Sequence, residues 1–129
     1  MKSVFPIVLT QESDCVLVYV PDMGINTEGS DIPDAMAMAR DAIGLVGITL
    51  EDEGKAIPKA SMLVDVRDKY KQGTVTLIDV DFTAYREEND RRTVRRNVSL
   101  PAWLNVKAEK AGLNVSAVLQ KALKAELNI

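Results

Sequence analysis

The sequence contains no histidine and only one cysteine, Cys15. The absence of histidine excludes Ser-His-Asp triads, histidine metal ligands and imidazole acid–base catalysis. A single cysteine cannot form an intrachain disulfide, which favours a cytoplasmic location. The longest apolar stretch, residues 42–50, is much shorter than the roughly 18 residues that a membrane span needs. Acidic side chains also follow the N-terminus too closely for a secretory signal peptide.

Charge is plentiful but unevenly distributed. Residues 1–90 hold 8 Lys and Arg against 17 Asp and Glu, whereas residues 91–129 hold 8 against 2. The net charge of −3 therefore conceals an acidic segment followed by a basic one. This asymmetry predicts two surfaces with different partners, a basic molecule for the first segment and an anion such as nucleic acid for the second.

Residues 1–85 predict a small α+β domain of ββαβ type. Two segments rich in β-branched residues, 3–11 and 15–21, predict a hairpin of two strands. The polar segment 22–31 is interpreted as a loop. The alternating segment 74–82 predicts a third strand that completes the sheet.

One long amphipathic helix is expected to cover this sheet. It begins after an N-cap at Ser30 or Asp31, with Pro33 near its first turn. Residues 62–70 are compatible with either a short helix or an edge strand, and the charged segment 86–92 is interpreted as a linker. The apolar positions of the helix recur every three or four residues, at Ala35, Met36, Ala39, Ile43, Val46 and Leu50.

The C-terminal part begins with four arginines, at positions 91, 92, 95 and 96. In the strand predicted over residues 93–99, apolar side chains such as Val94 and Val98 share one face, and Thr93, Arg95 and Asn97 share the other. The arginines alone are also compatible with a solvated linker that balances the acidic residues before it. The helices that follow favour a folded module over this alternative.

Two short helices complete the module of residues 93–129. Pro101 suits the first turn of one helix, Gly112 its end, and Asn114 the N-cap of the next. A strand and two helices of this length cannot bury a core alone. We therefore expect a two-fold dimer in which two strands pair antiparallel above four helices. The apolar positions of the second helix are Val115, Val118, Leu119, Ala122 and Leu127.

A paired ribbon of this kind fits the DNA major groove, where arginine suits guanine and asparagine suits adenine. Backbone N–H groups at the start of the last helix suit a phosphate. The residues predicted to contact DNA are Thr93, Arg95, Asn97, Arg91, Arg92, Asn114 and Ser116.

The segment "NVSLPAWLNVKAEKAGLNVSAVLQKALKAEL" resembles the ribbon-helix-helix DNA-binding half of HicB-type antitoxins. The segments "EGSDIPDAMAMARDAIGLVGITLEDEGKAIPKAS" and "TVTLIDVDFTAY" are similar to the HicB domain, a shortened RNase H-like fold. The resemblance implies an antitoxin that silences HicA, a small basic mRNA-cleaving toxin, and represses its own operon. The sequence departs from the family pattern at Arg96, where an apolar strand residue is expected.

The acidic charge of residues 1–85 suits a basic toxin that handles RNA. Part of the toxin contact is expected in the loop 22–31, and the candidate contact residues are Asp22, Met23, Glu28 and Asp31. Neither a cofactor nor a metal is expected.

Two other functions are compatible with parts of the sequence. A weak metal-dependent nuclease would need converging carboxylates, and Asp79 and Asp81 share one face of the third predicted strand, with Asp65 or Asp68 as further candidates. The first predicted strand carries no acidic residue at its centre, so a solvated sheet face is the preferred interpretation. A regulator that senses a small ligand would be a third class, but no glycine-rich phosphate loop supports it.

Overall fold

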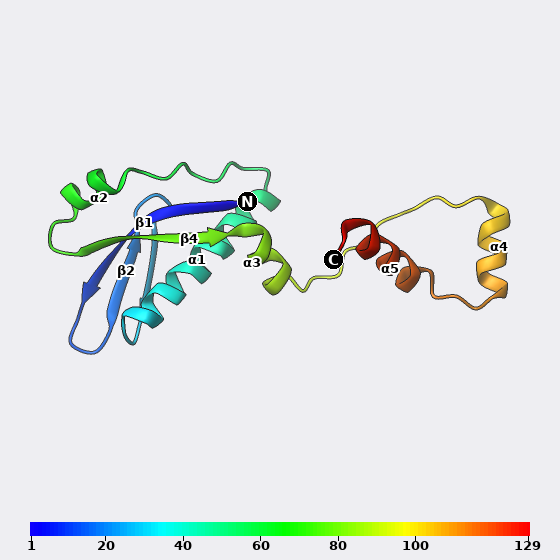
Figure 1. The fold of residues 1–129 in the computed structure, drawn as a ribbon, viewed down its shortest axis with the longest axis horizontal. Helices are drawn as coiled ribbons and strands as arrows, with labels where there is room; N and C mark the ends of the chain where they lie inside the picture. Colours follow the sequence, from blue (N-terminus) through cyan, green and yellow to red (C-terminus); the bar gives the residue numbers. More distant parts are fainter. The chain divides into compact units, whose positions relative to one another are not determined.

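A computed structural model describes all 129 residues and contains a four-stranded sheet and five helices (Figure 1). The predicted α+β class is confirmed. The chain divides into two compact units, Met1–Arg92 and Thr93–Ile129. In chain order the elements are β1 (Lys2–Gln11), β2 (Val16–Val20), β3 (Ile25–Gly29), α1 (Ile32–Asp52), α2 (Leu63–Lys69), β4 (Thr74–Asp81), α3 (Phe82–Asn89), α4 (Ala102–Lys110) and α5 (Val115–Leu127).

The sheet belongs to the first unit and has the order β3-β2-β1-β4, with every neighbouring pair antiparallel. The predicted hairpin of the first two strands is confirmed, and Val8 lies opposite Tyr19 in its register. Strand β4, also predicted, pairs with β1 along most of its length, with Phe5 opposite Ile78. This pairing closes the sheet between residues far apart in the sequence.

The interpretation of residues 22–31 as a loop is wrong, because this segment contains β3. Gly24 has a φ of 62°, so the chain turns tightly after β2 and returns beside it. Strand β3 lies at the edge of the sheet, and its residues Asn26 and Glu28 are exposed. An edge strand with one solvated face has little apolar character, which is why the composition resembled a loop.

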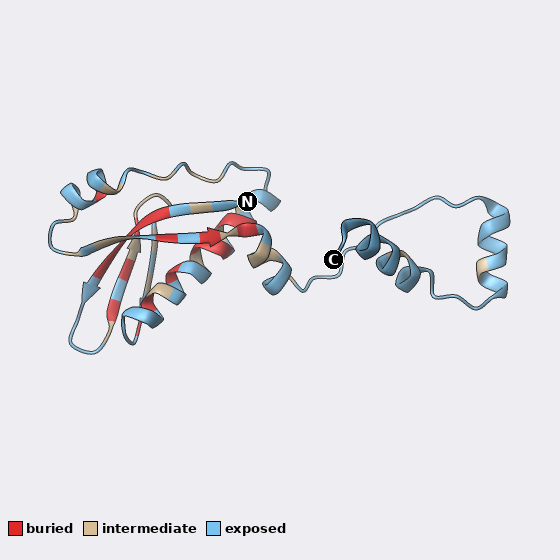
Figure 2. Ribbon diagram, viewed as in Figure 1, coloured by how far each residue is buried: buried red, intermediate tan, exposed pale blue.

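Helix α1 lies across one face of the sheet and contacts all four strands (Figure 1). Asp31 is its N-cap and accepts a hydrogen bond from the Asp34 backbone N–H at 2.8 Å, and Pro33 lies in the first turn, as predicted. The helix packs its buried stripe on the core (Figure 2). That core consists of Phe5, Ile7, Leu9, Val16, Val18, Val20, Ala35, Ala39, Ile43, Ile78, Val80 and Phe82.

Helix α2 and the residue that ends it cover part of the opposite face of the sheet. The ambiguity over residues 62–70 is resolved in favour of the helix, and Val66 is its buried residue. Tyr70, which ends α2, packs edge-on against Tyr19 with 5.7 Å between ring centroids. Since Tyr19 alternates with the core residues of β2, this contact lies on the face away from α1. Asp22 holds the segment before α2 by accepting from the backbone N–H of Ser61 at 3.0 Å.

Residues 86–92, expected to be a linker, are folded against α1 instead. Helix α3 extends to Asn89 and contacts α1 through two glycines. A Cβ added at Gly44 would lie 2.4 Å from the Tyr85 ring, and one at Gly47 would lie 2.1 Å from the Phe82 ring. These close approaches explain why α1 carries glycine on a buried face. The first unit extends beyond residue 85 to Arg92 because Arg86 and Arg92 bind the end of α1.

Candidate binding surfaces

The second unit, Thr93–Ile129, has no buried residue. Figure 2 shows its helices exposed along almost their whole length, in contrast to the red core positions of the first unit. A folded unit with so much exposed apolar surface needs a partner to cover it. The large exposed hydrophobic residues here are Val94, Val98, Leu100, Trp103, Leu104, Val106, Leu113, Val115, Val118, Leu123, Leu127 and Ile129.

The helices α4 and α5 form where the sequence predicted them. Pro101 is the N-cap of α4, directly before its first turn, and Gly112 has a φ of 66° just after its end. Asn114 caps α5, accepting a hydrogen bond from the Ala117 backbone N–H at 3.1 Å. The side-chain oxygen of Asn114 is therefore occupied by the cap.

The strand predicted over residues 93–99 does not form in the single chain. A strand acquires its backbone hydrogen bonds from a neighbouring strand, and no strand of this chain pairs with the segment. The side chains of Thr93, Arg95 and Asn97 are all exposed there. Their alternation is a property of the sequence, and a ribbon requires a second copy of the segment.

Arg91 and Arg92, both predicted to contact DNA, have different environments. Both side chains are exposed, but only Arg92 is held by carboxylates. Its Nε donates to Asp90 Oδ1 at 2.8 Å, and its Nη2 donates to Asp90 Oδ2 at 2.8 Å and to Asp52 Oδ2 at 3.0 Å. The hydrogen bonds from the Arg92 guanidinium hold the pKa of Asp90 far below its usual range.

Arg86 extends this cluster from α3. Its Nη2 lies 3.2 Å from Glu51 and 3.0 Å from Asp52, and its Nη1 lies 3.2 Å from Asp90. It also donates to the backbone carbonyl of Ile48 at 3.2 Å. Helix α1 has acidic residues and no basic residue in its last turn. Because the carboxyl end of a helix favours cations, the two arginines offset an unfavourable concentration of negative charge.

The four residues predicted to contact a toxin differ in how free they are. Asp22 binds Ser61, Asp31 caps α1, and Met23 packs against the core. Glu28 is the exposed member, on the edge strand β3. A hydrogen bond, a helix cap and core packing account for the other three side chains, so Glu28 is the strongest contact candidate among the four.

Glu28 belongs to an acidic cluster around Cys15 that the sequence reading did not recognise. Partial burial raises the pKa of the Cys15 thiol, and a hydrogen bond and negative charge from Glu28 raise it further. Asp14 and Glu12, in the β1–β2 turn, act in the same direction. Because the raised pKa disfavours the thiolate, Cys15 is a poor nucleophile. Only the pairing of β3 with β2 brings Glu28 beside this turn.

Two of the four carboxylates considered for a nuclease have other partners. Asp79 lies 3.2 Å from Arg40 Nη2 in an exposed salt bridge. Asp81 caps α3 by accepting from the Ala84 backbone N–H at 3.2 Å, and this bond is the first cause of its lowered pKa. No three Cys, Asp or Glu side chains are grouped so that they could hold a metal ion.

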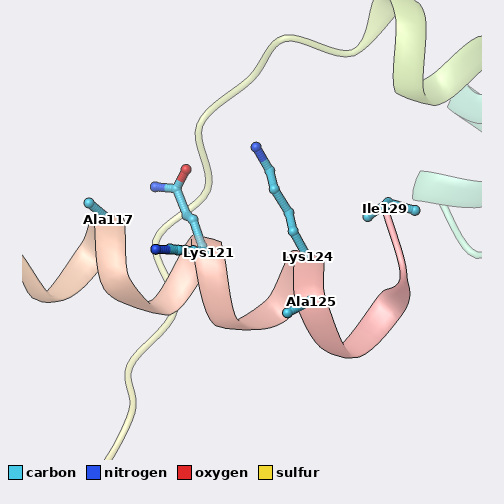
Figure 3. A pocket seen from close by; sticks show the side chains of 6 residues that line it. Ala117, Lys121, Lys124, Ala125 and Ile129 are labelled. Atoms are coloured by element: carbon cyan, nitrogen blue, oxygen red, sulfur yellow. The ribbon is translucent and has the colours of Figure 1, made fainter.

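A shallow groove along α5 adds basic residues that sequence reasoning did not single out. Lys121 and Lys124 extend from the helix beside Ala117 and Ile129, as Figure 3 shows. The groove has a volume of about 510 Å³ and no acidic residue in its lining. Their spacing of three places both lysines near one face of the helix. The second unit therefore carries positive charge on α5 as well as on its N-terminal segment.

These surfaces define a two-part chain, an acidic α+β unit with its own core and a basic helical unit without one. The model of the HicB-like antitoxin family of bacterial toxin–antitoxin systems matches residues 5–122. The chain therefore belongs to this family of antitoxins. None of its helices combines the length and the apolar character needed to cross a membrane.

Solved structures show the same fold over nearly the whole chain. One is described as a toxin–antitoxin complex from Streptococcus pneumoniae, with 18% identity, a TM-score of 0.61, and 98% of this chain and 99% of that chain covered. Another is the antitoxin HicB of Burkholderia pseudomallei, with 25% identity, a TM-score of 0.56, and coverage of 97% and 96%. The chain has no significant match among curated proteins.

Proposed function

We propose that this antitoxin binds and inhibits a HicA-type mRNA-cleaving toxin and represses its own operon by binding operator DNA. The observation that carries the proposal is the contrast between its units. The first unit is acidic and complete in itself, and the second is basic and has no buried residue. Opposite charges suit opposite partners, a basic RNA-handling protein and a nucleic acid.

In this proposal the first unit, a shortened RNase H-like domain, neutralises the toxin. Glu28, with the acidic β1–β2 turn beside it, contributes to the contact. Acidic side chains steer a basic partner and cover the surface that would bind RNA. Asp22, Met23 and Asp31 support the contact by holding the backbone around it.

The second unit acts as a ribbon-helix-helix module. Two copies pair their segments 93–99 antiparallel, and α4 and α5 of both copies pack their exposed apolar side chains together. This arrangement supplies the strand partner that the single chain lacks and closes a core that one copy cannot build. The dimer then presents Thr93, Arg95 and Asn97 twice on one surface.

DNA recognition divides between bases and phosphates. Arg95 and Asn97 read base edges in the major groove, and Arg91 and the start of α5 around Ser116 contact phosphates. With six to eight basic contacts, a dimer should show a slope of roughly −5 to −7 for log affinity against log salt.

Co-expression with the neighbouring reading frame tests the toxin assignment. We expect a small basic protein to co-purify with the antitoxin and to stop growth when it is expressed alone. Replacement of Glu28 by lysine should weaken its capture, whereas Lys121→Glu on α5 should not. A neighbour that is harmless, or capture that depends on the second unit alone, would overturn the assignment.

A further inference from the structure

The arginine at the end of the first unit has exchangeable partners. The guanidinium of Arg92 binds both oxygens of Asp90 and one oxygen of Asp52. Arginine binds a phosphate through the same N–H groups that it uses here for carboxylates. A phosphate that binds Nε and Nη2 of Arg92 together must therefore displace these carboxylates.

The contact with Asp90 is stronger than an ordinary surface pair. It is bidentate, and the Asp90 side chain is only 16% exposed, compared with 65% for Arg92. Arg86 approaches the same carboxylate from α3, so the position of Asp90 is fixed. Arg91, one residue earlier, forms no salt bridge and is exposed. Arg92 is therefore held by carboxylates, and its neighbour Arg91 is free.

We propose that Asp52 and Asp90 form a latch that holds Arg92 on α1 and keeps it from DNA until a phosphate displaces the two carboxylates. This inference rests on the proposed DNA binding and makes it more specific. The latch tethers the last residue before the second unit to the end of α1. The latch also lowers the affinity for any DNA, because Arg92 must break its contacts with the carboxylates before it can bind a phosphate.

The test compares Asp52→Asn and Asp90→Asn with Glu53→Gln. The control removes the same charge one position along the chain, where Glu53 pairs with Lys55 instead. Binding is measured on the protein's own promoter and on an unrelated duplex across a salt series. The two latch variants should bind both DNAs roughly two- to tenfold more tightly. Their salt slope should match that of the wild type, because Arg92 reaches a phosphate in each complex, whereas Arg92→Ala should make the slope of a dimer shallower by about 2, at about 0.9 for each lost contact. Glu53→Gln should match the wild type.

The Arg92→Ala background separates the latch from a general charge effect. If Asp52 acts through Arg92, Asp52→Asn should have no effect on DNA affinity once Arg92 is alanine. A gain in affinity that persists in this background would overturn the latch, and so would latch variants that bind DNA like Glu53→Gln. A wild-type protein that binds no DNA would refute the proposed function itself, and the latch with it. Thermal melts show which variants are folded, and Asp52→Asn provides the test if Asp90→Asn unfolds.

Discussion

The two units of this antitoxin solve the problem of the hydrophobic core in different ways. Residues 1–92 bury Phe5, Ile43 and Ile78 almost completely between a sheet and a helix. Residues 93–129 leave Trp103 and Leu127 more than 60% exposed and bury nothing. The first unit has a complete core as a single copy, whereas the second leaves its apolar side chains exposed. The charge is divided in the same way, because the first unit is acidic and the second is basic.

A unit can have its local folding signals in the sequence and still lack a core of its own. Local signals in the second unit are all in place, including the Asn114 cap and the turn at Gly112. Such signals contribute about 1 kcal/mol each and cannot replace a core. Stability of the second unit should therefore depend on protein concentration, and that of the first should not.

Replacement of Ile43 by alanine gives the largest expected effect on the stability of the fold. Ile43 is fully buried in the core of the first unit, so its loss removes apolar contacts and leaves a cavity. We expect the free energy of unfolding to fall by about 2–5 kcal/mol, independently of protein concentration. Denaturant titration at two concentrations measures this. Leu45→Ala, on the exposed side of the same helix, should cost less than about 1 kcal/mol.

Leu119→Ala tests whether the second unit builds its core from two copies. Leu119 is predicted to face the second copy, so its truncation should weaken pairing by about 2–5 kcal/mol, if the interface packs like a core. Light scattering over a dilution series should show the wild type as a dimer or a larger assembly, and the variant dissociating at higher concentration. Lys121→Ala on the same helix is the control. A wild type that stays monomeric and keeps its helices would contradict the dimer.

Ser116→Ala should have a smaller effect, confined to DNA binding. The hydroxyl is exposed in the first turn of α5, where a phosphate contact is proposed. We expect a loss of about 0.5–1.5 kcal/mol per copy on every DNA sequence, without a change in base preference. Gel shifts on promoter and unrelated duplexes measure both. A loss restricted to the promoter would instead assign Ser116 to base recognition.

Acid should lower the stability of the first unit more than that of the second, and this effect should be the smallest of these four predictions. The pKa of Asp81 is lowered by the Ala84 N–H, and that of Asp52 by Arg86. Because these folded-state values lie below the unfolded value of about 4, their contribution to stability is present above that pH. It is lost as the pH falls through the folded-state values. Thermal melts between pH 3 and pH 7 should show this, and Asp81→Asn should reduce the dependence.

Sequence reasoning predicted the elements that carry strong local signals. The β1–β2 hairpin, the Asp31 cap with Pro33, and β4 all have periodicity or capping residues that act within a few positions. It missed β3, because an edge strand with polar residues has no local signature. It also missed α3, whose charged residues suggested a linker. Helix α3 is held by contacts with Gly44 and Gly47, which are distant in sequence.

The candidate site was predicted only in part, for a similar reason. Residues 91–100 are all exposed in the single chain, so the alternation around Arg95 and Asn97 stays a prediction, and the capture of Arg92 by Asp52 requires the fold. Likewise, Asp22 resembled a contact residue, and only the structure shows it bound to Ser61. Partners supplied by remote elements decide which charged residues are free, and spacing along the chain does not reveal them.

The central claim is that the two units bind different partners, and the most direct test measures binding to both partners with one preparation. The double variant Arg95→Ala/Asn97→Ala is measured by gel shift on the protein's own promoter and by capture of the co-expressed toxin. The account predicts a loss of roughly 2–6 kcal/mol per copy in promoter binding, with an intact dimer and unchanged toxin capture. Unchanged promoter affinity with the dimer intact would contradict the ribbon in the groove. Loss of toxin capture would contradict the separation of the two functions between the two units.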